Sequence, residues 1–261
     1  MVAWYLRKKG RLMRPGEEMR LLGIRKGGRL WKAMEEVEEG AAQRMRGRTQ
    51  SVHVAKELWR RAVKPWLREG ERVQLWSVCS GIDAWGEALD QEVGQKGWRH
   101  GGAAEWGEAE RKVLQQAWGL KEEEIAWDAR EAVGWAKAAT PGGVCVMGFP
   151  CAWWSALPHG KQIDAATREA RRGEALRDLR KMMEVVAARK PDVWILENVP
   201  HLLADDMKKW YIKVNAEMRA QQGYWWRHQE VCQWRHTGVP ARRSRLWWAA
   251  VRTEEAGGAD A

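Results

Sequence analysis

Cysteine is scarce in this chain: the only four are Cys79, Cys145, Cys151 and Cys232, and no two form a Cys-x-x-Cys pair. This spacing argues against a disulfide scaffold and against a structural zinc site, so we expect no metal. No apolar run approaches the ~20 residues of a membrane-spanning helix, which excludes a spanning protein. The N-terminus lacks the apolar core of a secretory signal, so we expect a reducing intracellular compartment.

Phenylalanine, asparagine and isoleucine are also rare, with one, two and six copies, whereas tryptophan occurs 20 times. A coding bias toward GC-rich codons would produce this pattern. We therefore expect most tryptophans to fill core positions that Phe, Tyr or Ile usually take, and not to form a stacking platform for bases. A residue type that persists against such a bias is informative where it occurs, above all at Phe149 and Asn198.

Positive charge is concentrated at the beginning of the chain. Residues 1–70 hold 18 Lys and Arg against 8 Asp and Glu, whereas residues 71–261 hold 27 against 27. A basic N-terminal extension over residues 1–70 beside a neutral body favours a polyanionic partner, because neutralised phosphates release counterions. A solvated or organelle-targeting leader would show the same charge balance and stays open as an alternative.

Short apolar runs alternate with helical stretches from residue 72 onward. We expect five strands followed mostly by helices, and a closing pair of strands: strands 73–79, 103–106, 124–127, 143–149 and 192–196, helices 83–93, 108–118, 164–190 and 205–221, closing strands 225–231 and 246–251. This alternation predicts an α/β fold with a mostly parallel sheet and helices on both faces. The sheet would occupy residues 71–252, with a disordered tail at 253–261.

Polar or small residues follow each of the first three predicted strands. They are Ser80-Gly81, Glu105 with Trp106 beside it, and Asp128. Ligands of such folds bind beyond the carboxyl ends of the strands, where an acid can accept ribose hydroxyls and an indole can stack on adenine. Each residue alone could be a turn, a helix N-cap or core, but together they favour an adenosyl cofactor. A GxGxxG fingerprint is missing, which makes NAD or FAD less suitable.

The next two strand ends carry groups suited to catalysis. Cys151 follows Pro150 and begins a loop, where dipoles and cations can stabilise a thiolate. A lone cysteine is more often a small core residue. The Glu197-Asn198 pair at the adjacent strand end favours the catalytic alternative, because a carboxyl group in a dry crevice can stay protonated near neutral pH and act as an acid.

These residues carry a family resemblance. Gly-Phe-Pro-Cys-Ala-Trp-Trp-Ser at 148–155 resembles the Gly-Phe-Pro-Cys-Gln-Pro-Phe-Ser motif of cytosine-C5 methyltransferases. Glu-Asn-Val at 197–199 and Gly-Val-Pro-Ala-Arg-Arg-Ser-Arg at 238–245 are similar to two further motifs of that family, Glu-Asn-Val and Gly-Val-Pro-Gln-x-Arg-x-Arg. Residues 79–84 correspond to its Phe-x-Gly-x-Gly-Gly cofactor loop. The order and spacing of the blocks agree over about residues 72–252.

The resemblance implies the Rossmann-like fold of class I methyltransferases and S-adenosylmethionine as the cofactor. The implied cofactor-binding residues are Cys79, Ser80, Gly81, Ile82, Glu105, Trp106, Asp128 and Pro150.

The resemblance also implies a catalytic set. The thiolate of Cys151 would add to C6 of cytosine, so that C5 becomes nucleophilic, and Glu197 would protonate or bind N3. Asn198 would hold the nucleophile loop in register, while Arg243 and Arg245 would bind the base oxygen, a nearby phosphate and the active-site loop. The substrate would be a cytosine flipped out of DNA, and a tRNA-type RNA substrate is an alternative.

The chain departs from the family pattern at several positions. Asp83 and Ala84 stand where the cofactor loop has glycines, and a carboxylate there would crowd or repel the methionine end of the cofactor. Ala152 and Ala241 replace glutamines of two motifs. These departures leave open a catalytically inactive, nucleic-acid-binding module. The five residues Cys151, Glu197, Asn198, Arg243 and Arg245 favour an enzyme.

The family's target-recognition region and last two motifs would lie beyond the strand that follows Arg245. A partner chain could therefore supply recognition. Residues 49–58 resemble the last motif, Gly-Asn-Ser-Val followed by a Val- and Ala-rich helix, which permuted members carry ahead of the cofactor loop. For a DNA-modifying enzyme we expect a nuclear location, with an organelle as the alternative.

Overall fold

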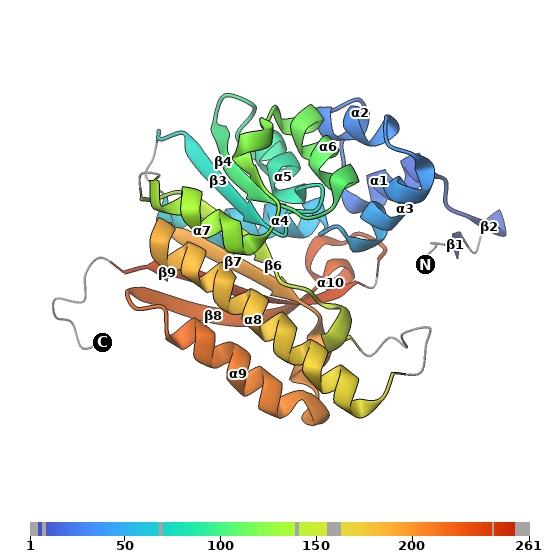
Figure 1. Ribbon diagram of the computed structural model, residues 1–261. Helices are drawn as coiled ribbons and strands as arrows, with labels where there is room; N and C mark the ends of the chain where they lie inside the picture. Colours follow the sequence, from blue (N-terminus) through green and yellow to red (C-terminus); the bar gives the residue numbers. More distant parts are fainter. Residues whose placement is uncertain are drawn as a thin grey trace.

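A computed structural model of the chain describes residues 5–6, 9–67, 70–138, 141–155, 163–241 and 243–253 (Figure 1). Of the tail predicted at 253–261, only Thr253 belongs to the described residues. Within these residues no helix is long and apolar enough to cross a lipid bilayer.

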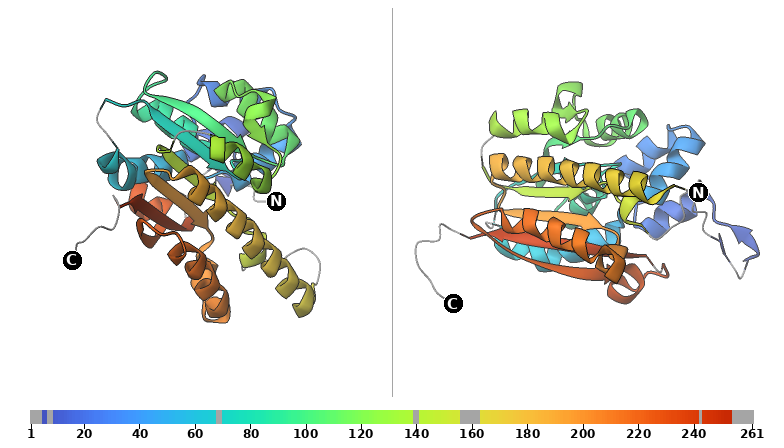
Figure 2. Two further views of the ribbon diagram at one scale, coloured as in Figure 1. Left: turned by 60° about the vertical axis from the view of Figure 1, so that its left-hand side comes forward. Right: turned by 60° about the horizontal axis from the view of Figure 1, so that its bottom comes forward.

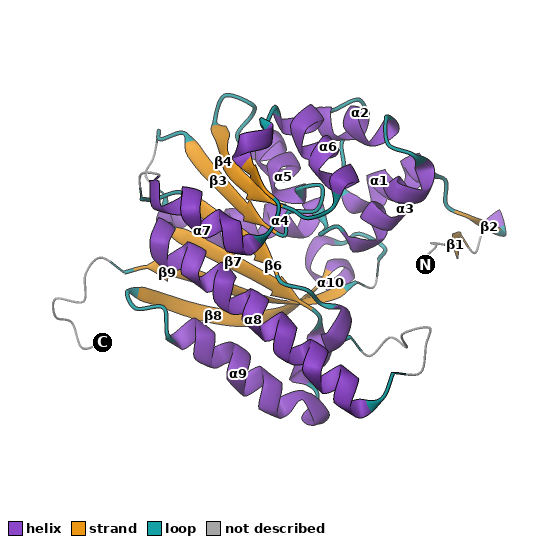
Figure 3. Cartoon of the chain, viewed as in Figure 1, coloured by secondary structure: helices purple, strands orange, loops and turns teal. Residues whose placement is uncertain are grey.

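A seven-stranded sheet forms the centre of the molecule, in the order β5-β4-β3-β6-β7-β9-β8 (Figure 3). The strands are β3 (Val73–Val78), β4 (Trp98–Ala104), β5 (Ile125–Ala126), β6 (Val144–Gly148), β7 (Val193–Asn198), β8 (Tyr224–Cys232) and β9 (Ser244–Arg252). The first five strands of that order pair in parallel, whereas β9 pairs antiparallel with both β7 and β8. This is the predicted Rossmann-like α/β fold.

Helices cover both faces of the sheet (Figures 1 and 2). They are α5 (Ala84–Glu92), α6 (Glu108–Trp118), α7 (Ala129–Ala138), α8 (Ala165–Arg189), α9 (Lys208–Arg219) and α10 (Gln233–Thr237). Successive side chains of β7 alternate between two buried clusters: Val193 and Ile195 pack with α5 and α6, and Trp194 and Leu196 pack with α8 and α9. Because both faces are covered, β7 is apolar from Val193 to Leu196, and its polar residues Glu197 and Asn198 come only at its carboxyl end.

The basic N-terminal segment is built into the fold. It forms a two-stranded hairpin and four helices: β1 (Tyr5–Leu6), β2 (Arg11–Leu12), α1 (Pro15–Leu22), α2 (Arg29–Glu35), α3 (Glu39–Arg48) and α4 (Val52–Leu58). Leu22, Leu30 and Val52 belong to the same buried cluster as α5 and one face of the sheet. A buried ion pair of 2.7 Å between Arg46 and Glu18 joins α3 to α1. The charge excess therefore lies on a packed helical layer.

Most described tryptophans are buried, as the composition predicts. Trp154, Trp194 and Trp248 are among the largest fully buried side chains, and Trp154 packs edge-on against both Phe149 and Trp210. Most of these indoles fill the space that smaller aromatic and aliphatic residues take elsewhere.

Candidate active site

Parallel pairing brings the carboxyl ends of five strands together. The carboxyl ends of β3, β4, β5, β6 and β7 lie along one edge of the sheet, which we call the catalytic edge. α10 and the helices α1 and α3 lie at this edge too (Figure 1). The predicted cofactor-binding and catalytic residues therefore share one edge, with neighbouring strands supplying the two groups.

The loop after β3 has an unusual backbone. Cys79, Gly81 and Asp83 all have positive φ, at 53°, 55° and 54°. Gly81 donates its backbone N–H to Glu105 at 2.7 Å, and a Cβ built on Gly81 would meet no atom within 4 Å. The loop thus curls back onto the end of β4 and leaves open space above Gly81, where a ligand can approach the backbone.

Glu105 connects the loop to the nucleoside end of the predicted cofactor site. Its second carboxylate oxygen accepts the N–H of Gly107 at 2.9 Å. Burial raises the pKa of Glu105, and the hydrogen bonds from Gly107 and Gly81 oppose that rise. Trp106 beside it is 73% exposed, so its indole is free to stack on an adenine ring.

The end of β5 adds a second exposed indole to this region. Asp128 follows Trp127, which is 54% exposed, and the guanidinium of Arg111 lies 3.1 Å from the Trp127 ring centroid. Asp128 was predicted from the sequence, whereas Trp127 and Arg111 were missed. The only signal for them was the position of Trp127 next to an acidic strand end, since Arg111 comes from the separate helix α6.

The other predicted cofactor-binding residues lie in the loop after β3 and the segment after β6. Ile82 is buried. The hydroxyl of Ser80 donates to the Ser77 carbonyl at 3.0 Å and lies 2.7 Å from the Ser77 hydroxyl. Cys79 is partly buried, and burial raises the pKa of its thiol. Pro150 lies two residues after Gly148, the last residue of β6, and directly precedes the predicted nucleophile.

The Asp83 carboxylate, expected from the sequence to crowd or repel the methionine end of the cofactor, is turned into the protein. The side chain is 2% exposed, with one oxygen 2.7 Å from Nε2 of His100 and the other accepting the N–H of Gly86 at 3.3 Å. It caps the N-terminus of α5 from a left-handed backbone, a conformation that Asp tolerates better than most residues. The carboxylate therefore points into the protein, away from the open space above Gly81. The loop at 79–84 thus fits the cofactor.

Cys151 lies at the catalytic edge just after β6, and the residue is solvent-exposed. Protein atoms nevertheless surround much of the sulfur, and this burial raises the pKa of the thiol; Glu197 raises it further, while Arg245 lowers it. Asn198 fixes the strand end before the cysteine, because its Nδ2 donates to the Phe149 carbonyl at 3.1 Å. Its oxygen accepts the N–H of Val199 at 2.8 Å.

Glu197 and Arg245 form an ion pair at the same edge. Nε of Arg245 lies 2.7 Å from Oε1 of Glu197, and the side chains are 25% and 12% exposed, respectively. The pair results from the antiparallel register of β7 and β9, in which Glu197 lies opposite Trp247, so that Arg245 reaches back toward it. The structure thus brings Cys151, Glu197 and Arg245 together, as the resemblance implies.

Arg243 makes contacts that the sequence did not indicate. Its two terminal nitrogens donate to the carbonyls of Gly47, at 3.2 Å, and Thr49, at 2.6 Å. Burial first, and then Arg245, lowers the pKa of Arg243 to about 10. We expected Arg243 at the base, a phosphate and the active-site loop, whereas its hydrogen bonds join the N-terminal helical layer to the catalytic edge.

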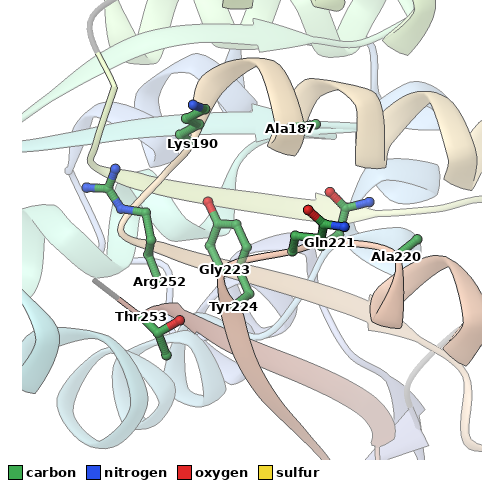
Figure 4. Close-up of a pocket in the computed structure, with 9 residues that line it drawn as sticks. Ala187, Lys190, Ala220, Gln221, Gly223, Tyr224, Arg252 and Thr253 are labelled. Carbon is green, nitrogen blue, oxygen red and sulfur yellow. The ribbon is translucent and has the colours of Figure 1, made fainter. Parts of the chain in front are cut away.

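One cavity lies away from this site. It has a volume of about 630 Å³ and is lined by residues that include Lys190, Gln221, Tyr224 and Arg252 (Figure 4). Since Tyr224 begins β8 and Arg252 ends β9, this cavity lies at the opposite edge of the sheet from Cys151. No group of three or more His, Cys, Asp or Glu side chains in the described part of the chain is placed to hold a metal ion.

A sequence model of the C-5 cytosine-specific DNA methylase family matches residues 73–257, which include every strand of the central sheet and all the predicted site residues. The chain belongs to this family. The match begins at β3, so the N-terminal helical layer lies outside it. No curated protein sequence matches the chain.

Several solved methyltransferase structures resemble this member of the family. A putative DNA modification methyltransferase from an E. coli prophage has 16% identity and a TM-score of 0.46, with 69% of this chain and 47% of that one covered. S. pombe Dnmt2 has 15% identity and a TM-score of 0.48, covering 72% and 53%. Entamoeba histolytica EhMeth has 12% identity and a TM-score of 0.48, covering 73% and 56%. The matched region thus spans about half the length of each of these proteins.

Proposed function

We propose that this chain is an S-adenosylmethionine-dependent methyltransferase that methylates C5 of a cytosine in DNA through a covalent adduct with Cys151. The observation that carries this proposal is the convergence of a solvent-exposed cysteine residue, a carboxylate and a guanidinium at the catalytic edge. A small core cysteine would be buried among apolar side chains, as Cys145 is. Cys151 is instead solvent-exposed, and the charges of Glu197 and Arg245 act on its thiol.

The roles of these groups follow from their chemistry. Cytosine C5 is a poor nucleophile until the thiolate of Cys151 adds to C6 and leaves an enamine across C5 and C4. Glu197 holds the proton at N3 that this addition requires, and Arg245, which pairs with Glu197, is placed to bind the base oxygen with its forked donors. After C5 has received the methyl group, loss of the C5 proton to water or another base re-forms the C5–C6 double bond, so that the C6–S bond breaks and its electron pair returns to Cys151 as the thiolate.

The residues for the cofactor lie at the ends of β3, β4 and β5. Gly81 offers open backbone, Glu105 a carboxylate for the ribose hydroxyls, Trp106 an adenine stacking surface, and Asp128 an acceptor for the adenine amino group. When bound, S-adenosylmethionine supplies the electrophilic methyl group that C5 receives. Its reactive end would have to lie toward β6, because Cys151 follows that strand.

Two features support DNA as the substrate. The family description names DNA, and the formal charge excess lies in the N-terminal layer beside the catalytic edge. A base in a duplex must be flipped out of the stack at a cost of a few kcal/mol, and phosphate contacts help to offset that cost.

The segment at 49–58 fits the proposed permuted last motif. α4 packs against α5, which follows the cofactor loop. Gln50 accepts the indole N–H of Trp85 at 3.0 Å, and its amide nitrogen would lie 3.4 Å from a Cβ built on Gly148. Gln50 therefore bridges the helix after β3 and the end of β6. We expect substitution of Gln50 and Ser51 to weaken cofactor binding, and unchanged binding would end this assignment.

Labelled methyl transfer to duplex DNA and to RNA hairpins, with trapping on 5-fluorocytosine in both, tests the proposed function. The C6–S bond breaks only after C5 loses a proton, and a fluorine at C5 cannot be removed in this way. An active enzyme therefore stays covalently attached to the 5-fluorocytosine substrate. We expect transfer and trapping with DNA, and loss of both in Cys151→Ala. Transfer to RNA alone would replace the substrate. Cofactor binding without transfer to either would support an inactive module instead.

A further inference from the structure

The C-terminal end of α3 lies beside the active site. Arg243 binds the carbonyl of Gly47 in the last turn of α3, and Arg245, two residues on, pairs with Glu197. α10 is held to the same N-terminal layer: it packs against α4, and its buried Gln233 donates to the Leu21 carbonyl of α1 at 3.0 Å. The ends of α3 and α10 thus flank one side of the catalytic edge.

The N-terminal arginines differ in their partners, and Arg14, Arg20 and Arg25 are exposed with no ion pair among the described residues. Others are engaged in carboxylate pairs of 2.6–2.8 Å: Arg11 with Glu17, Arg29 with Asp90, Arg46 with Glu18, and Arg60 with Glu92. Arg44 and Arg48 are exposed and have no ion pair within the described residues. They are four residues apart on α3 and therefore share one face of the helix. Backbone hydrogen bonds first, and then Arg44, lower the pKa of Glu38, which caps the N-terminus of α3. Glu38 therefore lies at the opposite end of the helix from Arg48, about 15 Å away along the helix axis.

α10 presents cationic and aromatic groups at the same place. Trp234 is 52% exposed, and Arg235 and His236 are exposed as well. The helix is anchored by Gln233 and by the Trp234 N–H, which donates to the Ala241 carbonyl at 3.1 Å. A fixed backbone that carries an exposed indole next to guanidinium groups suits contact with bases and phosphates together.

We propose that Arg44, Arg48, Trp234, Arg235 and His236 form a DNA-binding surface, the α3–α10 surface, that holds the duplex next to the cytosine entering the site. This inference rests on the proposed function. Charge complementarity supports it: Arg44, Arg48 and Arg235 are exposed and have no ion pair among the described residues, whereas Arg46, between the first two on α3, is buried against Glu18 and Glu39. The family match begins at β3, so α3 contributes a part of this surface that lies outside the matched region.

Binding of the full-length chain to a labelled duplex, measured across salt concentrations, tests the surface without requiring catalysis. The triple variant Arg44→Gln, Arg48→Gln, Arg235→Gln removes three phosphate contacts. We expect its Kd at physiological salt to rise about tenfold or more, and the slope of log affinity against log salt to fall by about 2 to 3. Trp234→Ala should weaken binding and leave the salt slope unchanged, because stacking releases no counterions.

The matched control removes the same charge from the opposite edge. Lys64, Lys96 and Arg99 are exposed near the amino ends of β3 and β4, and their triple Gln variant should keep the wild-type slope. Equal losses of DNA affinity in both triple variants, with unchanged melting temperatures, would overturn the α3–α10 surface. An unaltered slope of log affinity against log salt in the Arg44, Arg48 and Arg235 variant would overturn it as well. Binding to an RNA hairpin and not to the duplex would overturn DNA as its occupant.

The two proposals can fail separately. Wild-type protein that binds DNA through this surface but never traps 5-fluorocytosine would refute the proposed function alone. Protein that traps 5-fluorocytosine, with an α3–α10 variant as tight and as salt-sensitive as wild type, would refute this inference alone.

Discussion

The guanidinium of Arg245 and the carboxylate of Glu197 lie 2.7 Å apart and act on the Cys151 thiol in opposite directions. Glu197 raises the pKa of the thiol and Arg245 lowers it, after burial has raised it. The carboxylate proposed to assist the base thus disfavours the thiolate in the free enzyme. The negative charge of Glu197 destabilises the Cys151 thiolate, and binding of the base must offset this effect before the thiolate can attack.

Glu197→Gln should therefore separate two properties of the site. Removing the negative charge lowers the pKa of Cys151 and releases Arg245 to stabilise the thiolate, so alkylation by iodoacetamide should become faster. Methyl transfer should fall by about 100-fold or more, because the proton at N3 is no longer held. Alkylation followed residue by residue with mass spectrometry, beside labelled transfer, measures both.

The matched variant for that experiment is Arg245→Gln, which should slow alkylation of Cys151 and also impair transfer. Cys232 serves as an internal reference, since a backbone hydrogen bond from Arg235 lowers the pKa of its thiol. Slower alkylation in Glu197→Gln would contradict the assigned electrostatics.

The reactivity of Cys151 in the free enzyme should depend steeply on pH. Its pKa lies above the ordinary thiol value, so the neutral thiol dominates at pH 7 and the thiolate fraction grows about tenfold per pH unit until the pKa is reached. Alkylation of Cys151 should rise through pH 7 to 9, whereas that of Cys232 should level off earlier. A plateau for Cys151 below pH 7 would mean a depressed pKa and would refute the raising effects given to burial and to Glu197.

Much of the site could be predicted from sequence because its residues end neighbouring parallel strands. Glu105, Asp128, Cys151 and Glu197 each follow a short apolar run, and parallel pairing places such positions at one edge. The apolar runs also located the central strands. The sheet, with its mainly local βα connections, could therefore be predicted from one chain.

What could not be predicted depends on contacts between distant segments. Nothing near Arg243 indicates that its partners are carbonyls 194 and 196 residues earlier. The inward turn of Asp83 depends on His100, which belongs to the next strand. Helix α7 also escaped prediction, as did the packing of α1–α3 into the core, since a strongly basic composition resembles that of a solvated arm.

Trp106→Ala should weaken binding of S-adenosylmethionine by about tenfold, because base–aromatic stacking contributes on the order of 1–3 kcal/mol. The side chain is largely exposed, so the melting temperature should stay near that of wild type. Isothermal titration gives the Kd. Trp66→Ala, which removes another exposed indole, is the control and should bind normally. Equal affinity in Trp106→Ala would remove this residue from the cofactor site.

Asp83→Asn should leave cofactor affinity within about twofold of wild type. Asn also tolerates the left-handed backbone, caps α5 and can hydrogen-bond His100, so only the charge is lost. If the carboxylate faced the cofactor and repelled it, the same variant would bind more tightly. Asp83→Ala loses the cap and strains the backbone at φ 54°, and it should destabilise the protein by about 1–3 kcal/mol in urea unfolding.

Arg243→Met tests whether the N-terminal layer is held to the catalytic edge through this one side chain. The substitution leaves the carbonyls of Gly47 and Thr49 without their charged donor, which should cost about 1–3 kcal/mol of unfolding free energy. Loosening of the junction between α3 and α4 should also speed limited proteolysis there. Arg243→Lys keeps one charged donor and should restore part of both properties. Proteolysis at the wild-type rate in Arg243→Met would show that buried apolar contacts alone, such as those of Val52 with α5, hold the layer in place.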